Sequence, residues 1–169
     1  MNICIDLNKF FINYISFLET KRNIIMEGNF TKLLYSNQYF TMNNIFIYLP
    51  IEYTGIEKVT NKNFLKFNPL VEKNSILIKE LSSVELKILE YYKLYFNSKR
   101  KVVNLLSRQL NSGNIKVLCD KKTDNYSFNK SMDIEEYKKE FILKISGVWE
   151  TYEDIGLTYK LLEISTRLN

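Results

Sequence analysis

The chain has 169 residues, of which 46% are hydrophobic and 25% are charged. These fractions are typical of a globular domain with a buried core and exclude wholesale disorder. No apolar run approaches the ~20 residues of a membrane span, which excludes an integral membrane protein. The first six residues, MNICID, place an acid where a signal peptide has a basic and then an apolar segment, so we expect no secretion.

Charge and residue types narrow the function further. The 24 Lys and Arg residues against 19 Asp and Glu give a net charge of +5, 14% of the residues are aromatic, and histidine is absent. The lack of histidine removes the side chain most used for acid–base catalysis and metal binding near neutral pH. A basic, aromatic-rich domain suits single-stranded nucleic acid, a polyanion with flat bases. The alternative, in which rings fill the core and the charge aids solubility, stays open at this level.

Cys4 and Cys119 are the two cysteines of the chain. Two such distant cysteines without histidine do not make a closed zinc site, so we expect no metal and no other cofactor. We expect two free thiols, and hence an intracellular, reducing compartment.

The N-terminal part of the chain is predicted to form three strands. Residues 10–19 carry aromatic and β-branched side chains that favour a strand, although Asp6 before them would equally open a short helix. A second strand is predicted over residues 30–35. Residues 42–53 give the clearest pattern, because aliphatic side chains at every second position predict one buried face and an aromatic and polar opposite face. A polar loop is predicted over residues 55–73.

A helical segment is predicted over about residues 79–112. Ser82 and Glu85 have the spacing of a capping box, and apolar residues follow at helical spacing. A second helix is predicted over residues 101–110, with Gly113 as its left-handed C-cap.

Strand patterns return in the C-terminal part. A short strand is predicted over residues 114–119, followed by a polar loop over residues 120–140. Alternation over residues 141–150, a turn, and a further strand over residues 155–164 predict an antiparallel hairpin.

The order of these elements predicts the fold class. No repeat or Pro/Gly linker divides the chain, so residues 1–169 are predicted to form a single domain. Three strands, a helical segment and two or three further strands predict an α+β fold, mainly antiparallel β. More finely, they predict an OB-like barrel of five or six strands with the helical segment between strands 3 and 4. The alternative is an α+β sandwich with the helices on one face of the sheet.

Catalytic patterns are scarce. The five glycines are scattered and form no phosphate-binding loop, and a Ser-His-Asp set needs a histidine. The acidic pairs Glu135–Glu136 and Glu153–Asp154 stand in polar sequence that favours solvated turns. We therefore expect no enzymatic activity, with a metal-dependent nuclease built from carboxylates as a remote alternative.

A nucleic-acid interface is predicted on the strands, because alternating strands can bury aliphatic residues and present rings and cations on the other face. The candidate stacking residues are Tyr35, Phe46, Tyr48, Trp149 and Tyr159, and the candidate phosphate contacts are Lys32, Lys116, Lys144 and Lys160. Core packing is the alternative for each ring, and a solvated sheet face is the alternative for the lysines. The alternative is strongest for Trp149, since strict alternation places it with Phe141, Leu143 and Ile145 on one face.

Lys99, Arg100 and Lys101 form the densest basic run. They are predicted to begin the second helix, where the helix dipole favours anions. This placement suggests that the run contacts a phosphate, and a solvated turn between helices is the alternative.

Three parts of the chain together resemble a known family. They are residues 29–45 (NFTKLLYSNQYFTMNNI), the middle stretches 85–92, 106–113 and 115–117, and residues 142–150 (ILKISGVWE) with 155–160 (IGLTYK). In these parts the chain resembles the OB-fold single-stranded DNA-binding proteins of large DNA viruses with AT-rich genomes. The resemblance implies sequence-tolerant coating of single strands in replication, recombination or repair, in the host cytoplasm or nucleus and with replication proteins as partners.

The leading hypothesis is a non-enzymatic binder of single-stranded DNA. RNA as a further ligand and assembly into a homo-oligomer stay open. The alternative is a structural or interaction subunit of a viral replication or virion complex that docks through the helical segment. That segment carries several large rings, namely Tyr91, Tyr92, Tyr95 and Phe96.

Overall fold

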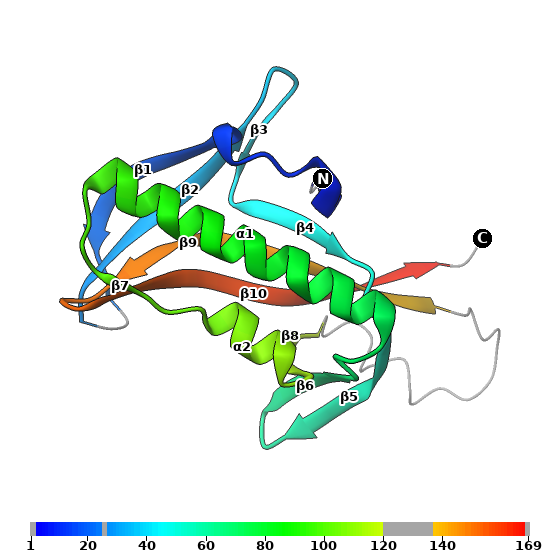
Figure 1. Cartoon of the computed structure of the whole chain (residues 1–169). Coiled ribbons are helices and arrows are strands. Elements are labelled where there is room, and N and C mark those ends of the chain that lie inside the picture. Colours follow the sequence, from blue (N-terminus) through cyan, green and yellow to red (C-terminus); the bar gives the residue numbers. More distant parts are fainter. Residues whose placement is uncertain (1–2, 25–26, 120–136, 168–169) are drawn as a thin grey trace.

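The computed structural model describes residues 3–24, 27–119 and 137–167, and its strands form one sheet with two helices against it (Figure 1). The strands are β1 (Ile15–Arg22), β2 (Asn29–Ser36), β3 (Thr41–Asn43), β4 (Ile45–Leu49), β5 (Tyr53–Val59), β6 (Lys62–Phe67), β7 (Lys101–Val102), β8 (Asn114–Leu118), β9 (Tyr137–Glu150) and β10 (Asp154–Arg167). The helices are α1 (Glu72–Phe96) and α2 (Leu105–Asn111), and short 3-10 turns occur at Leu7–Lys9 and Ile12–Tyr14. Across the sheet the order is β1-β2-β9-β10-β8-β6-β5, with β3 beside β2, β4 beside β9 and β7 beside β10.

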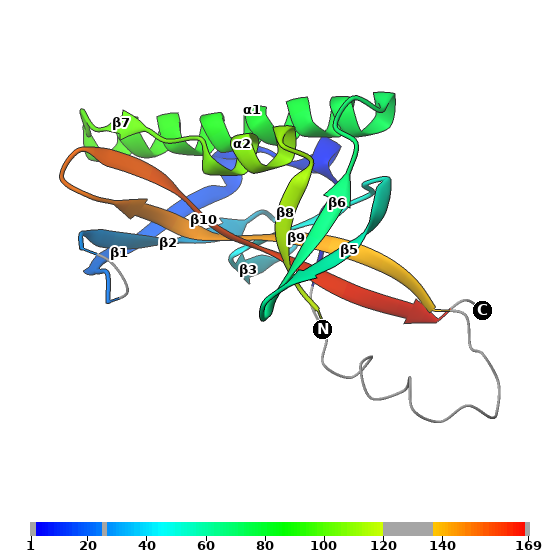
Figure 2. The ribbon, with the colours of Figure 1, turned by 90° about the horizontal axis from the view of Figure 1, so that it is seen from below.

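The predicted class, α+β with a mainly antiparallel sheet, is confirmed. The ladders between named strands are antiparallel except where β10 runs parallel to β7 and to β8. The sheet is open and has ten strands, so a closed barrel of five or six strands is not confirmed. In the described part of the chain six strands precede α1, where three were predicted. Both helices lie on one face of the sheet, as in the alternative topology (Figure 2).

Several predicted elements are present with shifted ends. β2, β8 and the antiparallel hairpin of β9 and β10 match the predicted strands. β9 begins at Tyr137, inside the predicted polar loop, and residues 120–136 of that loop lie outside the described residues. The predicted first strand begins later than expected, because residues 12–14 form a 3-10 turn before β1. Gly113 follows α2 with φ +67°, the left-handed conformation predicted for it.

Two predictions in the N-terminal half are wrong. The predicted loop over residues 55–73 contains the hairpin of β5 and β6. β5 is an exposed edge strand with no buried residue, so it lacks the apolar alternation by which a strand is recognised. The single strand predicted over residues 42–53 is broken at Asn44, whose φ of +72° interrupts extended backbone between β3 and β4.

α1 begins well before the predicted capping box, and tertiary hydrogen bonds anchor its first turn. Val71, at its N-cap, makes no side-chain capping bond. The fully buried Asn74 accepts from the Glu52 backbone N–H at 2.9 Å and donates to the carbonyls of Glu52 at 2.8 Å and Asn68 at 2.9 Å. The amide therefore joins α1 to the segment between β4 and β5.

Glu85 caps α2 instead of its own helix. Its carboxylate is fully buried and accepts from the backbone N–H groups of Leu106 at 3.0 Å and Ser107 at 2.8 Å, and from the Ser107 hydroxyl. Asn104, at the N-cap of α2, makes no side-chain capping bond. A carboxylate from α1 thus satisfies the free N–H groups at the positive end of α2 and fixes α2 against α1.

The core lies between α1 and the sheet. Aliphatic side chains at every second strand position are buried on the helix side, as Ile45, Ile47 and Leu49 of β4 show. α1 contributes the apolar stripe that meets them, namely Leu77, Ile78, Leu81, Val84, Ile88 and Leu89. Neither helix of the described chain combines the length and apolar character that a membrane span requires.

Glu85→Ala tests the carboxylate cap. The change leaves the first turn of α2 without its buried acceptor, so we expect the free energy of unfolding to fall by about 2–4 kcal/mol in urea denaturation. Glu85→Gln keeps one acceptor oxygen and should cost less. Glu80→Ala, at an exposed position of α1, is the matched control and should change stability by less than about 0.5 kcal/mol. Wild-type stability in Glu85→Ala would contradict the cap.

Candidate nucleic-acid interface

We call the sheet face turned away from α1 and α2 the open face (Figure 2). By strand register and burial it carries rings and lysines. Successive side chains of a strand point to opposite faces, so the residues between the core positions point to this side. The open face consists of Phe30, Lys32, Phe46, Tyr48, Lys116, Leu118, Ile142, Lys144, Gly147, Trp149, Gly156, Thr158, Lys160 and Leu162.

Strand pairing arranges all of these residues except Lys116 in four rows. The rows are Phe30–Trp149–Gly156, Lys32–Gly147–Thr158, Phe46–Lys144–Lys160 and Tyr48–Ile142–Leu162–Leu118. At 3.3 Å per residue, the distance along β9 from Ile142 to Trp149 is about 23 Å. Aromatic rings and ammonium groups therefore lie side by side over a surface several strands wide.

A β-bulge brings Trp149 onto the open face. Ile145 is opposite Tyr159 and Gly147 is opposite Thr158, so Ser146 is an extra residue in β9. One extra residue reverses the alternation of the side chains that follow it. Strict alternation, which would group Trp149 with the buried Phe141, is therefore wrong from the bulge onward.

Phe30 and Trp149 each lie directly over a glycine of the neighbouring strand. A Cβ atom at Gly147 would stand 2.5 Å from the Phe30 ring, and one at Gly156 would stand 2.4 Å from Cζ2 of Trp149. The indole N–H of Trp149 also donates to the Leu157 carbonyl at 3.2 Å. The two rings thus lie close against the sheet in fixed positions.

The lysines of the open face are free to meet an anion. Within the described chain, Lys32, Lys116, Lys144 and Lys160 take part in no ion pair. Lys144 Nζ lies 5.7 Å from the centre of the Phe46 ring, a cation–π distance. The Tyr48 hydroxyl donates to Glu140 at 3.0 Å, and burial together with this carboxylate raises the pKa of Tyr48.

Two predicted stacking residues point to the helix side. Tyr35 is 1% exposed, packs against Phe10 and Phe40, and its hydroxyl accepts from the Phe11 N–H at 3.2 Å. A fully buried ring cannot stack on a base, so the prediction for Tyr35 is wrong. Tyr159 is half-buried, and burial followed by the charge of Glu85 raises its pKa.

The predicted basic run does not begin a helix. Lys99 and Arg100 follow α1, and Lys101 enters β7 beside the β9–β10 hairpin, where its N–H donates to the Glu153 carbonyl at 2.8 Å. Lys99 and Lys101 are exposed. The unfavourable helix-dipole placement that suggested a phosphate contact is therefore absent.

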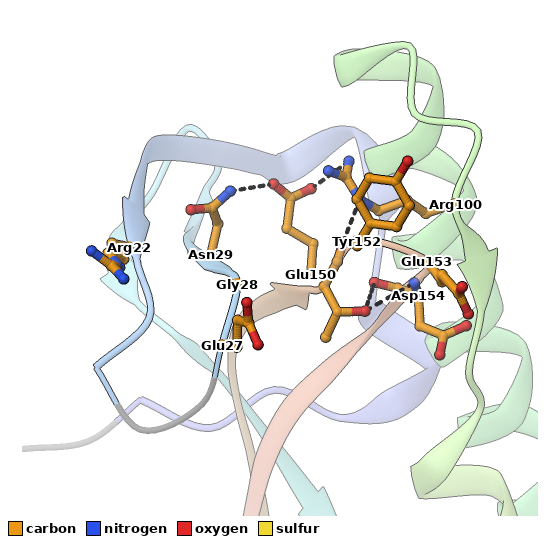
Figure 3. Close-up of a pocket in the computed structure, with 10 residues that line it drawn as sticks. Arg22, Glu27, Gly28, Asn29, Arg100, Glu150, Tyr152, Glu153 and Asp154 are labelled. Carbon is orange, nitrogen blue, oxygen red and sulfur yellow. Dashed lines mark hydrogen bonds and ion pairs between the residues drawn. The ribbon is translucent and has the colours of Figure 1, made fainter.

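Arg100 is engaged with a buried carboxylate (Figure 3). Its Nη1 lies 3.1 Å from Glu150 Oε2, and its Nε donates to the Thr151 carbonyl at 2.6 Å. Glu150 also accepts from Asn29 Nδ2 at 2.9 Å and from the Tyr92 hydroxyl at 3.1 Å. These bonds join β2, β9, α1 and the segment after α1, so Arg100 is a structural ion-pair partner in this arrangement.

A pocket of about 660 Å³ adjoins Arg100 at the tip of the β9–β10 hairpin (Figure 3). Besides Glu150, the carboxylates of Glu27, Glu153 and Asp154 line it, against the cations Arg22 and Arg100. This acidic excess repels a phosphate backbone, so we leave the pocket out of the interface. Within the described ranges no cluster of three or more His, Cys, Asp or Glu could hold a metal ion. Glu135 and Glu136 lie outside them.

The two thiols are free, as expected, and half-buried. Burial is the main cause that raises the pKa of Cys4 and of Cys119 to about 11, with Asp6 adding to the first and Glu163 to the second. Both thiols therefore stay protonated, and poorly nucleophilic, near neutral pH.

Sequence reasoning missed Phe30 and Gly156. Phe30 alternates with Thr31, whose polar side chain suggests solvent; yet Thr31 is fully buried, and its hydroxyl bonds those of Thr20 at 2.7 Å and Tyr92 at 3.1 Å. A buried threonine conceals which face of β2 is the outer one. The signal that could have found Gly156 is a glycine near the start of the second hairpin strand, where a close approach of a side chain from the first strand is expected.

Comparisons of the chain with protein-family models, curated proteins and solved structures found no match.

Gly156→Ala tests whether the indole of Trp149 packs directly on Gly156. The new methyl group overlaps the ring of Trp149, so we expect the ring to move into solvent and the emission of this single tryptophan to shift to longer wavelength. Gly55→Ala is the matched control, because no heavy atom other than those of Gly55 and its two chain neighbours lies within 4 Å of the Cβ position. Unchanged emission in Gly156→Ala would contradict the described contact.

Proposed function

We propose that the chain binds single-stranded nucleic acid, DNA above all, on the open face, in a sequence-tolerant manner and without catalysis, in replication, recombination or repair. One observation carries the proposal. Four lysines without an ion-pair partner among the described residues share one sheet face with Phe30, Phe46, Tyr48 and Trp149. Phosphates pair with the lysines, and bases stack on the rings.

General magnitudes indicate what the lysines and the rings of this surface each contribute to binding. Each neutralised phosphate of a single strand contributes about −0.7 to the slope of log K against log salt, so four lysines give about −2.8. Each base stacked on a ring contributes ~1–3 kcal/mol. Duplex DNA gains only the first contribution, because its bases are already stacked on one another. The surface therefore favours single strands.

The OB-like barrel and the resemblance to viral single-stranded DNA-binding proteins belong to the same proposal. Two observations support the barrel. A helical segment lies between the two groups of strands, and the sheet curls so that the Tyr53 ring of β5 meets the Phe141 ring of β9 with centroids 5.1 Å apart. These two strands are well separated in the order of the sheet.

Anisotropy titration of labelled oligo(dT) at several salt concentrations tests the proposal. We expect Lys144→Ala and Lys160→Ala each to make the salt slope shallower by about 0.7. Phe46→Ala should weaken binding about 5- to 150-fold and leave the slope unchanged, because it removes stacking and no charge.

Lys79→Ala on the exposed side of α1 is the matched control for charge and should change neither quantity. Three results would contradict the proposal: binding indifferent to salt, a preference for duplex, or an equal loss in Lys79→Ala.

A second candidate function is docking of a partner protein on the C-terminal end of α1. One observation favours it: Leu94 and Tyr95 are 81% and 61% exposed. Tyr92 is buried, and the rings of Tyr91, Tyr95 and Phe96 pack around Phe17, which leaves Leu94 as the most exposed apolar side chain of this end.

Sedimentation of the chain without nucleic acid separates the two candidates. If the second is correct, the chain forms a stable oligomer that Leu94→Ser disrupts, and it has no affinity for oligonucleotides. A monomer that binds oligo(dT) equally well with and without Leu94→Ser would contradict it.

A further inference from the structure

The edge of β10 has a gap in its pairing, next to the open face. β10 pairs with β7 at Asp154 and Ile155 and with β8 at Leu161 and Leu162. Between these points, residues 156–160 have no strand partner on the side away from β9 in the part of the chain that the structure describes. A pocket of about 420 Å³ opens at this gap, and we call the gap and its pocket the β10 notch.

The notch offers backbone hydrogen-bonding groups. The Ile155 carbonyl accepts from the Val103 N–H on this side of β10, and strand geometry turns every second residue to the same side. The N–H and C=O groups of Leu157 and Tyr159 therefore point into the notch. The Leu157 carbonyl accepts from the Trp149 indole, which places the edge of the indole at the notch.

Side chains complete a site of mixed character. Leu105 and Gln109 of α2 form one wall, and Leu118 of β8 lies near the rim. Gln109 is exposed, and so are the aliphatic side chains of Leu105 and Leu118. Lys116 and Lys160, which form no ion pair with a described carboxylate, line the same pocket. Apolar walls, a few converging polar groups and flanking cations are what a flat, polar-edged ring linked to a phosphate requires.

We infer that the β10 notch binds one unstacked nucleobase of the single strand, with the base against Trp149, its polar edge toward the β10 backbone and Gln109, and its phosphates near Lys116 and Lys160. This inference rests on the function proposed above and adds a base-binding pocket to it. A peptide strand fits less well, because β7 and β8 close the gap at both ends and leave only residues 156–160 to pair with. The pair of lysines also favours an anionic ligand.

The β10 notch adds to the open face one position at which the binding free energy depends on which base is bound. Stacking on the open face tolerates any base, whereas hydrogen bonds to a base edge depend on its donors and acceptors. We expect a modest preference among homopolymers that originates in the notch and not in the rows of the open face.

Emission of Trp149, the single tryptophan of the chain, reports a base at the indole, and substitution of Gln109, which lines the notch and not the open face, tests whether that base lies in the notch. The chain of 169 residues is titrated with oligo(dT) and with an abasic oligonucleotide of the same length and phosphate number. We expect both to bind at low salt and only oligo(dT) to quench the emission. Gln109→Ala should weaken oligo(dT) binding about three- to tenfold, as loss of a hydrogen bond to a base does, and leave the abasic affinity unchanged.

Gln38→Ala, an exposed glutamine in the turn before β3, is the matched control and should behave as wild type. Binding of oligo(dT) with unchanged Trp149 emission, or equal quenching by the abasic strand, would overturn the base pocket and also remove Trp149 from the stacking rings of the open face. An equal loss of oligo(dT) affinity in both Gln variants, or no loss in either, would overturn the base pocket and leave the proposed function intact. No binding of either oligonucleotide would overturn both.

Discussion

The division of the sheet into one face buried beneath α1 and one face left open is the constraint on which the other features depend. Hydrophobic burial of the aliphatic side chains fixes which face of each strand points to the core. Because successive side chains point to opposite faces, the side chains between them point to the open face. Burial of Ile45 and Ile47 in β4 therefore turns Phe46 outward, and burial of Leu143 and Ile145 turns Lys144 outward. The rings and cations of the open face are the counterpart of a well-formed core, and the bulge at Ser146 is the point where the alternation shifts.

Buried carboxylates hold the pieces of this arrangement together. An ionised carboxylate inside a protein is costly unless donors surround it. Glu85 meets this condition at the start of α2, and Glu150 meets it with Arg100, Asn29 and Tyr92. Glu85 sets the position of α2 and so of the wall of the β10 notch. Glu150 uses the one arginine of the basic run, which explains why that run does not add its full charge to a phosphate-binding surface.

The sequence predicts most of the strands and the identity of the outward lysines, because hydrophobic alternation records directly which side chains are buried. It fails where position depends on partners distant in the chain. The start of α1 is fixed by the hydrogen bonds of Asn74, and the edge strand β5 has no apolar pattern. The strand over β2 is predicted correctly, but the ring of Tyr35 lies on its buried face and not on its outer face. Trp149 shows the limit most clearly, since strict alternation groups this predicted stacking residue with buried side chains, and only pairing with β10 reveals the bulge that places it on the open face. The β10 notch arises from the gap between two parallel pairings, which no local pattern encodes.

The central claim is that a single strand lies on the open face, and lysine acetylation with mass-spectrometric readout tests it most directly. The account predicts that saturating oligo(dT) protects Lys32, Lys116, Lys144 and Lys160 several-fold and leaves Lys79 and Lys87, on the exposed side of α1, as reactive as in the free chain. Protection of the α1 lysines with unchanged reactivity on the open face would contradict it.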